Sequence, residues 1–292
     1  MNNKHLAVLM TCHNRRDTTL SCLQTLYQQE AIFDLYIVDD GSSDGTAEAI
    51  KRKYPKVKIL KGNGQLFWGG GMRLAFATAM EQKYEYYLWL NDDTFLNSNV
   101  IPKLLKTHQF LSKKGYPKSI VVGSVTDPVT GELTYGGRIP SKRLFSFKFD
   151  SLEPGKEPQE CSTMQGNCVL IPDLVAEIVG NIDPAFIHTM GDLDYGLRAC
   201  KLGCSVWVAP EYAGTCSKNS AVNSWADANL SSLERLQKAI QPKAFPIKAR
   251  AIYTKRHKGV FWVFHWLLPY IRAAIGYKNL NFSSSFKSEN KT

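Results

Sequence analysis

The stretch "LYIVDDGSSDGTAEAIKRKY" (35–54) decides the fold class. It opens with a short apolar run that stops at two acids and a glycine, as expected for a strand buried on both faces. Ser and Asp residues then provide capping signals ahead of a short helical segment. The stretch therefore predicts one strand followed by one helix, which is the repeating unit of an α/β protein.

The same pattern recurs on both sides of this unit. Apolar runs predict further strands at 6–11, 57–60, 86–90 and 119–125, and helical spacing predicts helices within 15–29, 71–82 and 97–114. This alternation predicts a Rossmann-like, mostly parallel sheet with helices on both faces. Ligands bind such sheets at the carboxyl ends of the strands. Three predicted strands end there in polar clusters, "TCHN" (11–14), "VDDGSSDGT" (38–46) and "LNDDT" (90–94).

The second half of the chain is less regular. The segment 134–150 is interpreted as a hairpin or a flexible loop, and 168–211 contains a further strand–helix–strand passage. We expect a catalytic domain over 1–215 and a C-terminal helical extension over 216–292. The aromatic-rich tail 257–277 contains Pro269 and Arg272, so it is not expected to span a bilayer. Two alternatives stay open for it: an amphipathic helix at a membrane surface, or a helix packed on the core.

Composition limits the partners and the compartment. The 292 residues include 36 basic and 26 acidic side chains, and the net charge of +10 favours an anionic partner such as a nucleotide or a phospholipid surface. Nucleic acid is not expected, because no nucleic-acid-binding module is recognisable. Seven scattered cysteines without a C-x-x-C pair indicate neither zinc nor disulfides. We expect a cytoplasmic protein, either free or peripheral at the inner face of the plasma membrane.

Adjacent carboxylates at 92 and 93 point to metal chemistry. Hard cations such as Mg²⁺ take oxygen ligands, usually one or two carboxylates together with phosphate oxygens. Asp92 and Asp93 follow a buried strand directly, so they could hold such an ion against a diphosphate. The alternative is helix capping by Asp93 or Thr94. We favour the metal site.

Three other polar segments each allow two interpretations. Asp39 and Asp40 could bind a nucleobase or a ribose, or could form an ordinary Asp-Gly turn. The glycine-rich "NGQLFWGGGMR" (63–73) could bind phosphate, with Arg73 adding charge, but close backbone packing is the favoured alternative. In "GDLDYGLRACKLG" (191–203), Asp192 is the candidate general base, because Asp194 lies four residues before Arg198 and can pair with it.

Together these motifs resemble the inverting family 2 glycosyltransferases of GT-A fold. The resemblance covers residue 6 to about residue 215 and rests on "VLMTCHNR" (8–15), "IVDDGSSDGT" (37–46), "LNDDT" as a version of the D-x-D motif, and 191–203 as a version of the E-D-x-D helix. It implies transfer of a sugar from a nucleotide diphosphate sugar, of UDP or dTDP type, with inversion at the anomeric carbon.

The resemblance also implies roles for individual residues. The donor nucleotide would be held by Thr11, Asn14, Asp39 and Asp40, with Thr11 and Asp39 at the base and Asp40 near the ribose. Asp93, with Asn91 beside it, would bind Mg²⁺ or Mn²⁺.

Further roles concern the sugar and the leaving group. Asp92 would help the metal directly or position the donor sugar, and Arg73 and the metal would stabilise the departing diphosphate. Asp192 would be the base that deprotonates the acceptor hydroxyl. Gln165 and Gly166, within "MQGNCVLI" (164–171), would line the donor and acceptor pocket.

The chain departs from the family pattern in three places. Asn91 and Gly191 stand where many relatives have acids, and "APEYAGTCSKNS" (209–220) has no histidine where many relatives have a further metal ligand. His188 lies nearby in sequence, but nothing places it at the metal. A degenerate protein that binds nucleotide or glycan without turnover therefore stays an alternative. A sugar nucleotidyltransferase fits less well, because "TCHNRRDTT" (11–19) lacks the glycines expected after its first strand.

Residues 63–73 also resemble bacterial enzymes that add rhamnose or galactofuranose to surface polysaccharides. This likeness implies a glycan or polyprenyl-linked glycan as the acceptor. A basic surface and an aromatic tail would suit such a membrane-held acceptor.

Overall fold

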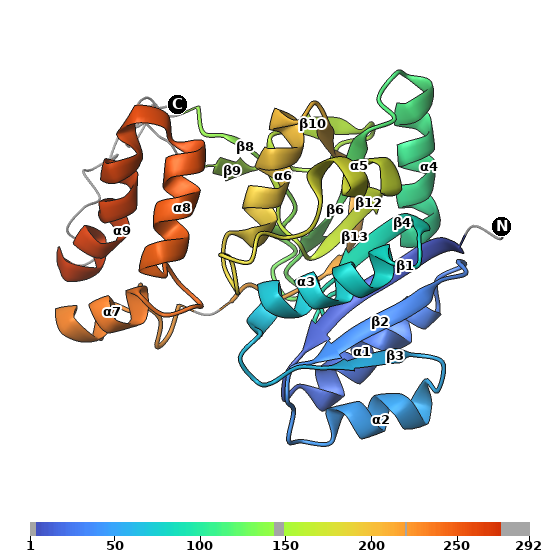
Figure 1. Cartoon of the computed structure of the whole chain (residues 1–292), viewed down its shortest axis with the longest axis horizontal. Coiled ribbons are helices and arrows are strands. Elements are labelled where there is room, and N and C mark those ends of the chain that lie inside the picture. Colours follow the sequence, from blue (N-terminus) through green and yellow to red (C-terminus); the bar gives the residue numbers. More distant parts are fainter. Residues whose placement is uncertain (1–3, 143–148, 220, 276–292) are drawn as a thin grey trace, which may run out of the picture. The chain divides into compact units, whose positions relative to one another are not determined.

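The computed structural model describes residues 4–142, 149–219 and 221–275 (Figure 1). The chain divides into two compact units, Met1–Lys218 and Asn219–Thr292. The sequence predicts the end of the first domain at residue 215. Each unit has its own arrangement of elements.

A sheet of ten strands forms the centre of the first unit. The strands are β1 (Lys4–Cys12), β2 (Asp34–Asp39), β3 (Lys58–Lys61), β4 (Tyr84–Leu90), β5 (Phe95–Leu96), β6 (Ser119–Thr126), β7 (Leu133–Tyr135), β10 (Gln159–Cys161), β12 (Cys168–Pro172) and β13 (Ser205–Thr215). Their order is β10-β13-β6-β12-β4-β1-β2-β3, with β5 beside β13 and β7 beside β6. The pairs β1–β2, β1–β4, β2–β3 and β6–β13 are parallel, whereas β12 is antiparallel to both β4 and β6. The predicted mainly parallel sheet is confirmed.

Helices cover both faces of this sheet (Figure 1). One face packs against α1 (Arg16–Tyr27), α2 (Thr46–Lys53) and α4 (Val100–Lys113), and the other against α3 (Phe67–Met80), α5 (Asp173–Val179) and α6 (Gly191–Lys201). The continuous apolar runs in the strands follow from this arrangement, since successive side chains point to opposite faces and both faces are buried. In β1, for example, Val8 and Met10 pack on the α1 side, and Ala7 and Leu9 on the α3 side.

A smaller sheet contains β8 (Gly137–Pro140), β9 (Phe149–Ser151) and β11 (Thr163–Met164), in the order β11-β8-β9. The strands β8 and β9 pair antiparallel, with Arg138 opposite Ser151. This pairing agrees with the hairpin interpretation of 134–150 rather than the flexible loop. Residues 143–148 of that segment lie outside the described residues.

The second unit contains α7 (Ser232–Ala239), α8 (Ile247–His257), a 3₁₀ turn η1 (Gly259–Phe261) and α9 (Trp262–Ile275). A capping box begins α7: Glu234 N–H donates to the Ser231 hydroxyl, and Ser231 N–H donates to the Glu234 carboxylate. α9 packs against both α7 and α8. Residues 276 and 277 of the predicted tail lie outside the described part of the chain. No helix among the described residues combines the length and apolar character needed to cross a bilayer.

Candidate functional site

The three polar clusters meet at the carboxyl edge of the sheet. Cys12 at the end of β1 is in register with Asp39 at the end of β2, and β4 lies on the other side of β1. Asn14 connects the first two clusters, because its side-chain oxygen accepts a hydrogen bond from Ser43 N–H at 2.7 Å. The clusters at 11–14, 38–46 and 90–94 therefore form one continuous edge, as the sequence predicts.

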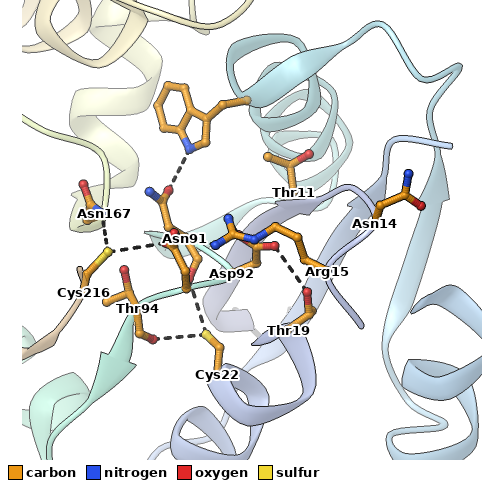
Figure 2. Close-up of polar contacts among 12 residues, drawn as sticks. Thr11, Asn14, Arg15, Thr19, Cys22, Asn91, Asp92, Thr94, Asn167 and Cys216 are labelled. Atoms are coloured by element: carbon orange, nitrogen blue, oxygen red, sulfur yellow. Dashed lines mark hydrogen bonds and ion pairs between the residues drawn. The ribbon is translucent and has the colours of Figure 1, made fainter. Parts of the chain in front are cut away.

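Arg15 holds the two adjacent carboxylates together. Its Nη1 donates to Asp92 Oδ1 at 3.0 Å, and its Nη2 donates to Asp93 Oδ2 at 2.9 Å. One guanidinium thus offsets the repulsion between two neighbouring anions, with a fork geometry that a lysine cannot reproduce. Figure 2 shows Arg15 beside Asp92.

Asp92 is the most enclosed of these groups. Its side chain is 7% exposed, and its Oδ2 accepts a hydrogen bond from the Thr19 hydroxyl at 3.3 Å. The pKa of Asp92 is raised to about 6: burial raises it most, Arg15 lowers it in part, and the negative charge of Asp93 adds to the rise. Both oxygens of Asp92 are therefore engaged by the protein.

Asn91 and Asp93 contact side chains from two other parts of the first unit. Trp68 on α3 donates its indole N–H to Asn91 Oδ1 at 2.7 Å. Asp93 Oδ1 lies 3.5 Å from the Cys216 thiol, which directly follows β13. The pairing of Phe95 in β5 with Thr215 in β13 brings this thiol to the carboxylates. Figure 2 shows Asn167 and Cys216 on one side of Asn91 and Asp92, and Thr11 and Asn14 on the other.

The predicted nucleotide residues organise their own loops. Asp40 is buried, and its two oxygens accept hydrogen bonds from Gly64 N–H at 2.8 Å and Phe67 N–H at 2.9 Å. Asp39 accepts one from Ser42 N–H at 3.1 Å. The Thr11 hydroxyl donates to the Val38 carbonyl at 3.3 Å. These side chains fix the edge on which a nucleotide would lie.

The glycine-rich segment 63–73 serves close packing. A Cβ at residue 69 would lie 2.1 Å from the Phe186 carbonyl oxygen, and one at residue 71 would lie 2.2 Å from Thr11 Oγ1. The first amides of α3 already have partners within the protein: Asp40 for Phe67, His188 for Trp68 and the Ile187 carbonyl for Gly69. The structure therefore supports the packing interpretation over a phosphate site at this helix end.

Arg73 lies elsewhere on α3. Its carbonyl oxygen accepts a hydrogen bond from Asn181 Nδ2, and its side chain lines a pocket of about 340 Å³ together with Asn181, Ile182, Asp183, Pro184 and Arg198. Within the described part of the chain, no hydrogen bond or ion pair joins the Arg73 guanidinium to Asp92 or Asp93. Its role at a diphosphate stays a prediction.

Asp192 lies in the first turn of α6. Its Oδ2 accepts a hydrogen bond from Gly166 N–H at 3.0 Å, and its Oδ1 accepts one from Leu193 N–H at 2.8 Å. Burial raises the pKa of Asp192 above its ordinary value, and the two backbone N–H groups lower it in part. The neighbouring Asp194 is fully buried and pairs with Arg198 at 2.8 Å, as its spacing predicts.

Trp68 contacts both Gly166, beside Asp192, and Asn91, beside the carboxylate pair. A Cβ at residue 166 would lie 2.5 Å from the Trp68 ring and 3.4 Å from Asp192 Cβ, so Gly166 is packed between them. The same indole binds Asn91. Gln165 precedes Gly166, and its buried Oε1 has no hydrogen-bond partner within the described part of the chain. The structure thus brings 91–93, 165–166 and Asp192 together around one tryptophan.

The sequence profile of glycosyl transferase family 2 matches residues 7–171, more than half of the chain. The chain belongs to this family.

Solved structures agree with the family. The glycosyltransferase is similar to the mannosyltransferase PcManGT from Pyrobaculum calidifontis, solved in complex with GDP-Man and Mn²⁺, at 14% identity and a TM-score of 0.53, covering 94% of this chain and 74% of that one. It is also similar to residues 1–349 of S. aureus TarS in complex with UDP, at 13% identity and a TM-score of 0.56, covering 94% and 91% of the two chains. This similarity confirms the predicted GT-A fold. No curated protein sequence matches the glycosyltransferase.

Of the three residues 91–93 in the glycosyltransferase, Asp93 fits a divalent cation best. Its side chain is 25% exposed, whereas Asp92 is enclosed by Arg15 and Thr19, and Asn91 Oδ1 accepts the Trp68 indole N–H. The described residues contain no group of three His, Cys, Asp or Glu side chains that could hold a metal ion on their own. The residues present therefore fit an ion held jointly by Asp93 and diphosphate oxygens, a mode that Mg²⁺ often uses.

Sequence reasoning missed four residues of this site: Arg15, Trp68, Asn167 and Cys216. Arg15 sits inside the quoted motif "VLMTCHNR", and Trp68 inside 63–73, but neither was assigned a role. Adjacent Arg16 is directed to Asp17 instead, at 3.0 Å, so the sequence alone does not identify which arginine faces the acids. Asn167 sits inside the quoted segment "MQGNCVLI" but was not assigned a role, and its carbonyl accepts a hydrogen bond from Asn91 N–H at 3.0 Å. Cys216 reaches the site through the pairing of β13 with β5, which no local pattern marks.

Proposed function

We propose that this glycosyltransferase moves a sugar from a nucleoside diphosphate sugar, of UDP or dTDP type, to a hydroxyl of a glycan or polyprenyl-linked glycan, with inversion. Surface polysaccharide synthesis is the process that we propose it serves. Support comes from the family and from the two similar structures, which hold UDP in one case and GDP-Man with Mn²⁺ in the other. A polyprenyl-linked acceptor would place the reaction at a membrane surface.

The contact series from Asp192 to Asn91 carries this proposal. Asp192 binds Gly166 N–H, Gly166 packs on the Trp68 ring, and the Trp68 indole N–H binds Asn91. These contacts connect the candidate base to Asn91, the residue directly before the carboxylate pair proposed to face the diphosphate. This proximity is what a direct displacement between an acceptor hydroxyl and a diphosphate sugar requires.

The reaction follows from these placements. An acceptor hydroxyl oxygen attacks the anomeric carbon from the face opposite the diphosphate, and a new glycosidic C–O bond forms. The bond between that carbon and the diphosphate oxygen breaks, and its electrons leave with the diphosphate. Asp192 takes the hydroxyl proton, and its raised pKa makes it a stronger base than an ordinary aspartate.

The donor is held on the other side of the site. Thr11, Asn14, Asp39 and Asp40 shape the edge for the nucleotide, and Asp92 fixes Arg15 and with it the geometry of Asp93. Asp93, with Asn91 beside it, would hold Mg²⁺ or Mn²⁺. When bound, such an ion supplies positive charge to the departing diphosphate. Arg73 is proposed to add to this charge.

Calorimetric titration of the full chain with UDP-, dTDP- and GDP-sugars, with and without Mn²⁺, tests the donor side. We expect one donor to bind with Mn²⁺ present, and Asp93→Asn to weaken that binding at least roughly tenfold because a charged ligand is lost. Glu48→Gln is the matched control, since Glu48 is exposed on α2. If binding were unchanged without metal and in Asp93→Asn, the metal role would be wrong.

Asp192→Asn tests the base separately. This variant should bind the same donor with unchanged affinity, while sugar transfer falls by roughly 10²–10⁴-fold, the usual contribution of a general base. In the wild type, the transfer rate should increase as pH rises through the raised pKa of Asp192, because the base must be ionised. Normal transfer by Asp192→Asn would contradict the assignment, and donor binding without any turnover in the wild type would favour the degenerate alternative.

A further inference from the structure

The helix α9 has two faces of different character. His265, Pro269 and Ala273 are buried and recur every four residues, so they form the side that packs within the second unit. Phe264, Leu267 and Ile271 recur at spacings of three and four residues, which places them together on the opposite side of α9, and the exposed Val260 lies just before the helix, in η1. We call these four residues the α9 apolar stripe.

The α9 apolar stripe is unusually exposed for large apolar side chains. Val260 is 88% exposed, Phe264 58%, Ile271 43% and Leu267 40%. More than half of the large apolar side chains exposed in the described residues lie in 221–275, which is less than a fifth of the chain. A concentration of this kind indicates an interaction surface rather than the scattered exposure normal for a soluble domain.

The charge around the stripe has one sign. The segment 247–275 contains six Lys or Arg residues and no acidic residue. Lys255, Arg256 and Lys258 precede the stripe immediately, and Arg272 follows Ile271 on the same helix. Lys and Arg close to a lipid surface strengthen binding when the lipid is anionic. An apolar stripe beside such charge matches a negatively charged partner with an apolar interior.

A bilayer surface offers both features that this segment matches, anionic headgroups and an apolar interior. Trp262 and Trp266 of α9 do not belong to the stripe, because they are only partly exposed and the Trp266 indole N–H donates to the Ile247 carbonyl within the second unit at 3.1 Å.

We propose that the second unit docks on a membrane surface that contains anionic lipid, with α9 lying in the plane of the interface and the α9 apolar stripe inserted below the headgroups. Lys255, Arg256 and Lys258 contact the headgroups. The helix lies on the bilayer and does not cross it. This inference concerns the second unit and does not depend on the proposed reaction.

Vesicle flotation with the full chain tests the docking. We expect binding to vesicles of phosphatidylcholine with 30% phosphatidylglycerol, and binding to pure phosphatidylcholine vesicles that is at least roughly tenfold weaker. Added salt should weaken the anionic binding, since it screens the headgroup charge. The double variant Phe264→Ser with Leu267→Ser should reduce binding to anionic vesicles at least roughly tenfold, because two inserted apolar side chains are lost.

Two controls keep the outcome interpretable. Ile32→Ser with Val129→Ser removes two exposed apolar side chains of the first unit and should leave vesicle binding unchanged. Circular dichroism of each variant confirms folding, and Lys255→Gln with Arg256→Gln weakens binding with the stripe intact. Equal binding to neutral and anionic vesicles would overturn the proposal. So would absent vesicle binding together with a dimer, measured by analytical ultracentrifugation, that the Phe264 and Leu267 substitutions dissociate.

Discussion

Arg15 shows at the scale of a single residue how the site tolerates two adjacent carboxylates. Its guanidinium binds Asp92 at 3.0 Å and Asp93 at 2.9 Å. The two carboxylates differ in burial, because the Asp92 side chain is 7% exposed and the Asp93 side chain is 25% exposed. The enclosed carboxylate acts as a fixed anchor for the arginine. Asp93 is more exposed, although its Oδ2 binds Arg15 and its Oδ1 lies 3.5 Å from the Cys216 thiol.

Enclosure of Asp92 has a measurable effect on stability. Its pKa in the folded protein, about 6, lies above the ordinary 3.8, so the folded state binds the proton more tightly than the unfolded state does. The free energy of unfolding therefore falls as pH rises from 3.8 to 6. Above pH 6 the buried charge of Asp92 lowers this free energy by its full amount. Below pH 3.8, Asp92 is protonated in both the folded and the unfolded state, and this destabilisation disappears.

Asp92→Asn should therefore raise the free energy of unfolding at about pH 8 by an amount on the order of 1–3 kcal/mol, since the amide carries no charge to desolvate. The gain should shrink as pH falls towards about 4. Urea denaturation at several pH values measures both effects, with Glu48→Gln as the exposed control. A gain that does not vary with pH would contradict the assigned cause.

Candidate residues could be proposed from the sequence where a local pattern marks them, at the end of a strand or the start of a helix. Asp39, Asp92 and Asp93 were proposed because they directly follow apolar runs that predict strands, and Asp192 because it lies at a predicted helix start. Trp68 and Cys216 could not be, because their positions depend on contacts between segments that are far apart in the chain. A local pattern does not contain that information.

At the scale of elements, the backbone of α3 lies so close to the 186–187 segment and to β1 that a Cβ atom at residue 69 or 71 would overlap them. Glycines at 69 and 71 let its backbone contact the 186–187 segment and Thr11 in β1, and these contacts place Trp68 between the two halves of the site. The position of Trp68 is therefore set by the packing of the helix, and the glycines are its structural cause.

Gly69→Ala should destabilise the protein by about 1–3 kcal/mol, because the added Cβ overlaps the fixed Phe186 carbonyl. Gly70→Ala is the matched control, since its added Cβ meets the Leu66 side chain at 3.3 Å and alanine favours a helix. Chemical denaturation measures the free energy of unfolding of the two variants and of the wild type. Equal stability of both would mean that the close approach at residue 69 is not needed.

Element prediction succeeded where a segment is long and periodic. The strands at 6–11, 35–41, 86–90 and 119–125 were located within a few residues, since burial on both faces leaves an unbroken apolar run. The helix expected over about 97–114 begins at Val100, because the pairing of β5 with β13 continues to Asn97, whose N–H donates to the Ala213 carbonyl at 2.9 Å, and Asn99 has a left-handed φ of 59°. Pairing with a strand more than a hundred residues later leaves no trace in the local sequence.

At the scale of the whole molecule, the chain consists of two compact units with a boundary at Lys218. Ser217, Lys218 and Asn219 are exposed, and the described residues between β13 and α7 form no helix or strand. Such a connection is readily accessible to proteases. The predicted division at residue 215 and this boundary are close, but the role of each unit stays a proposal.

Limited digestion with trypsin should therefore cut after Lys218 among the earliest sites and release a stable fragment that ends there. Mass spectrometry of the fragments identifies the cut, and Lys218→Gln should remove it while the rest of the pattern is unchanged. Early cleavage within the sheet of the first unit would contradict the division.

The place of β12 in the sheet has a consequence for biosynthesis. β12 lies between β4 and β6, although it follows both in sequence. During translation, β4 and β6 therefore leave the ribosome with facing edges that have no partner until residues 168–172 emerge. Exposed edges of this kind can pair with other chains. A nascent or prematurely terminated chain that stops before Cys168 should depend on chaperones to stay unaggregated, whatever the finished enzyme transfers.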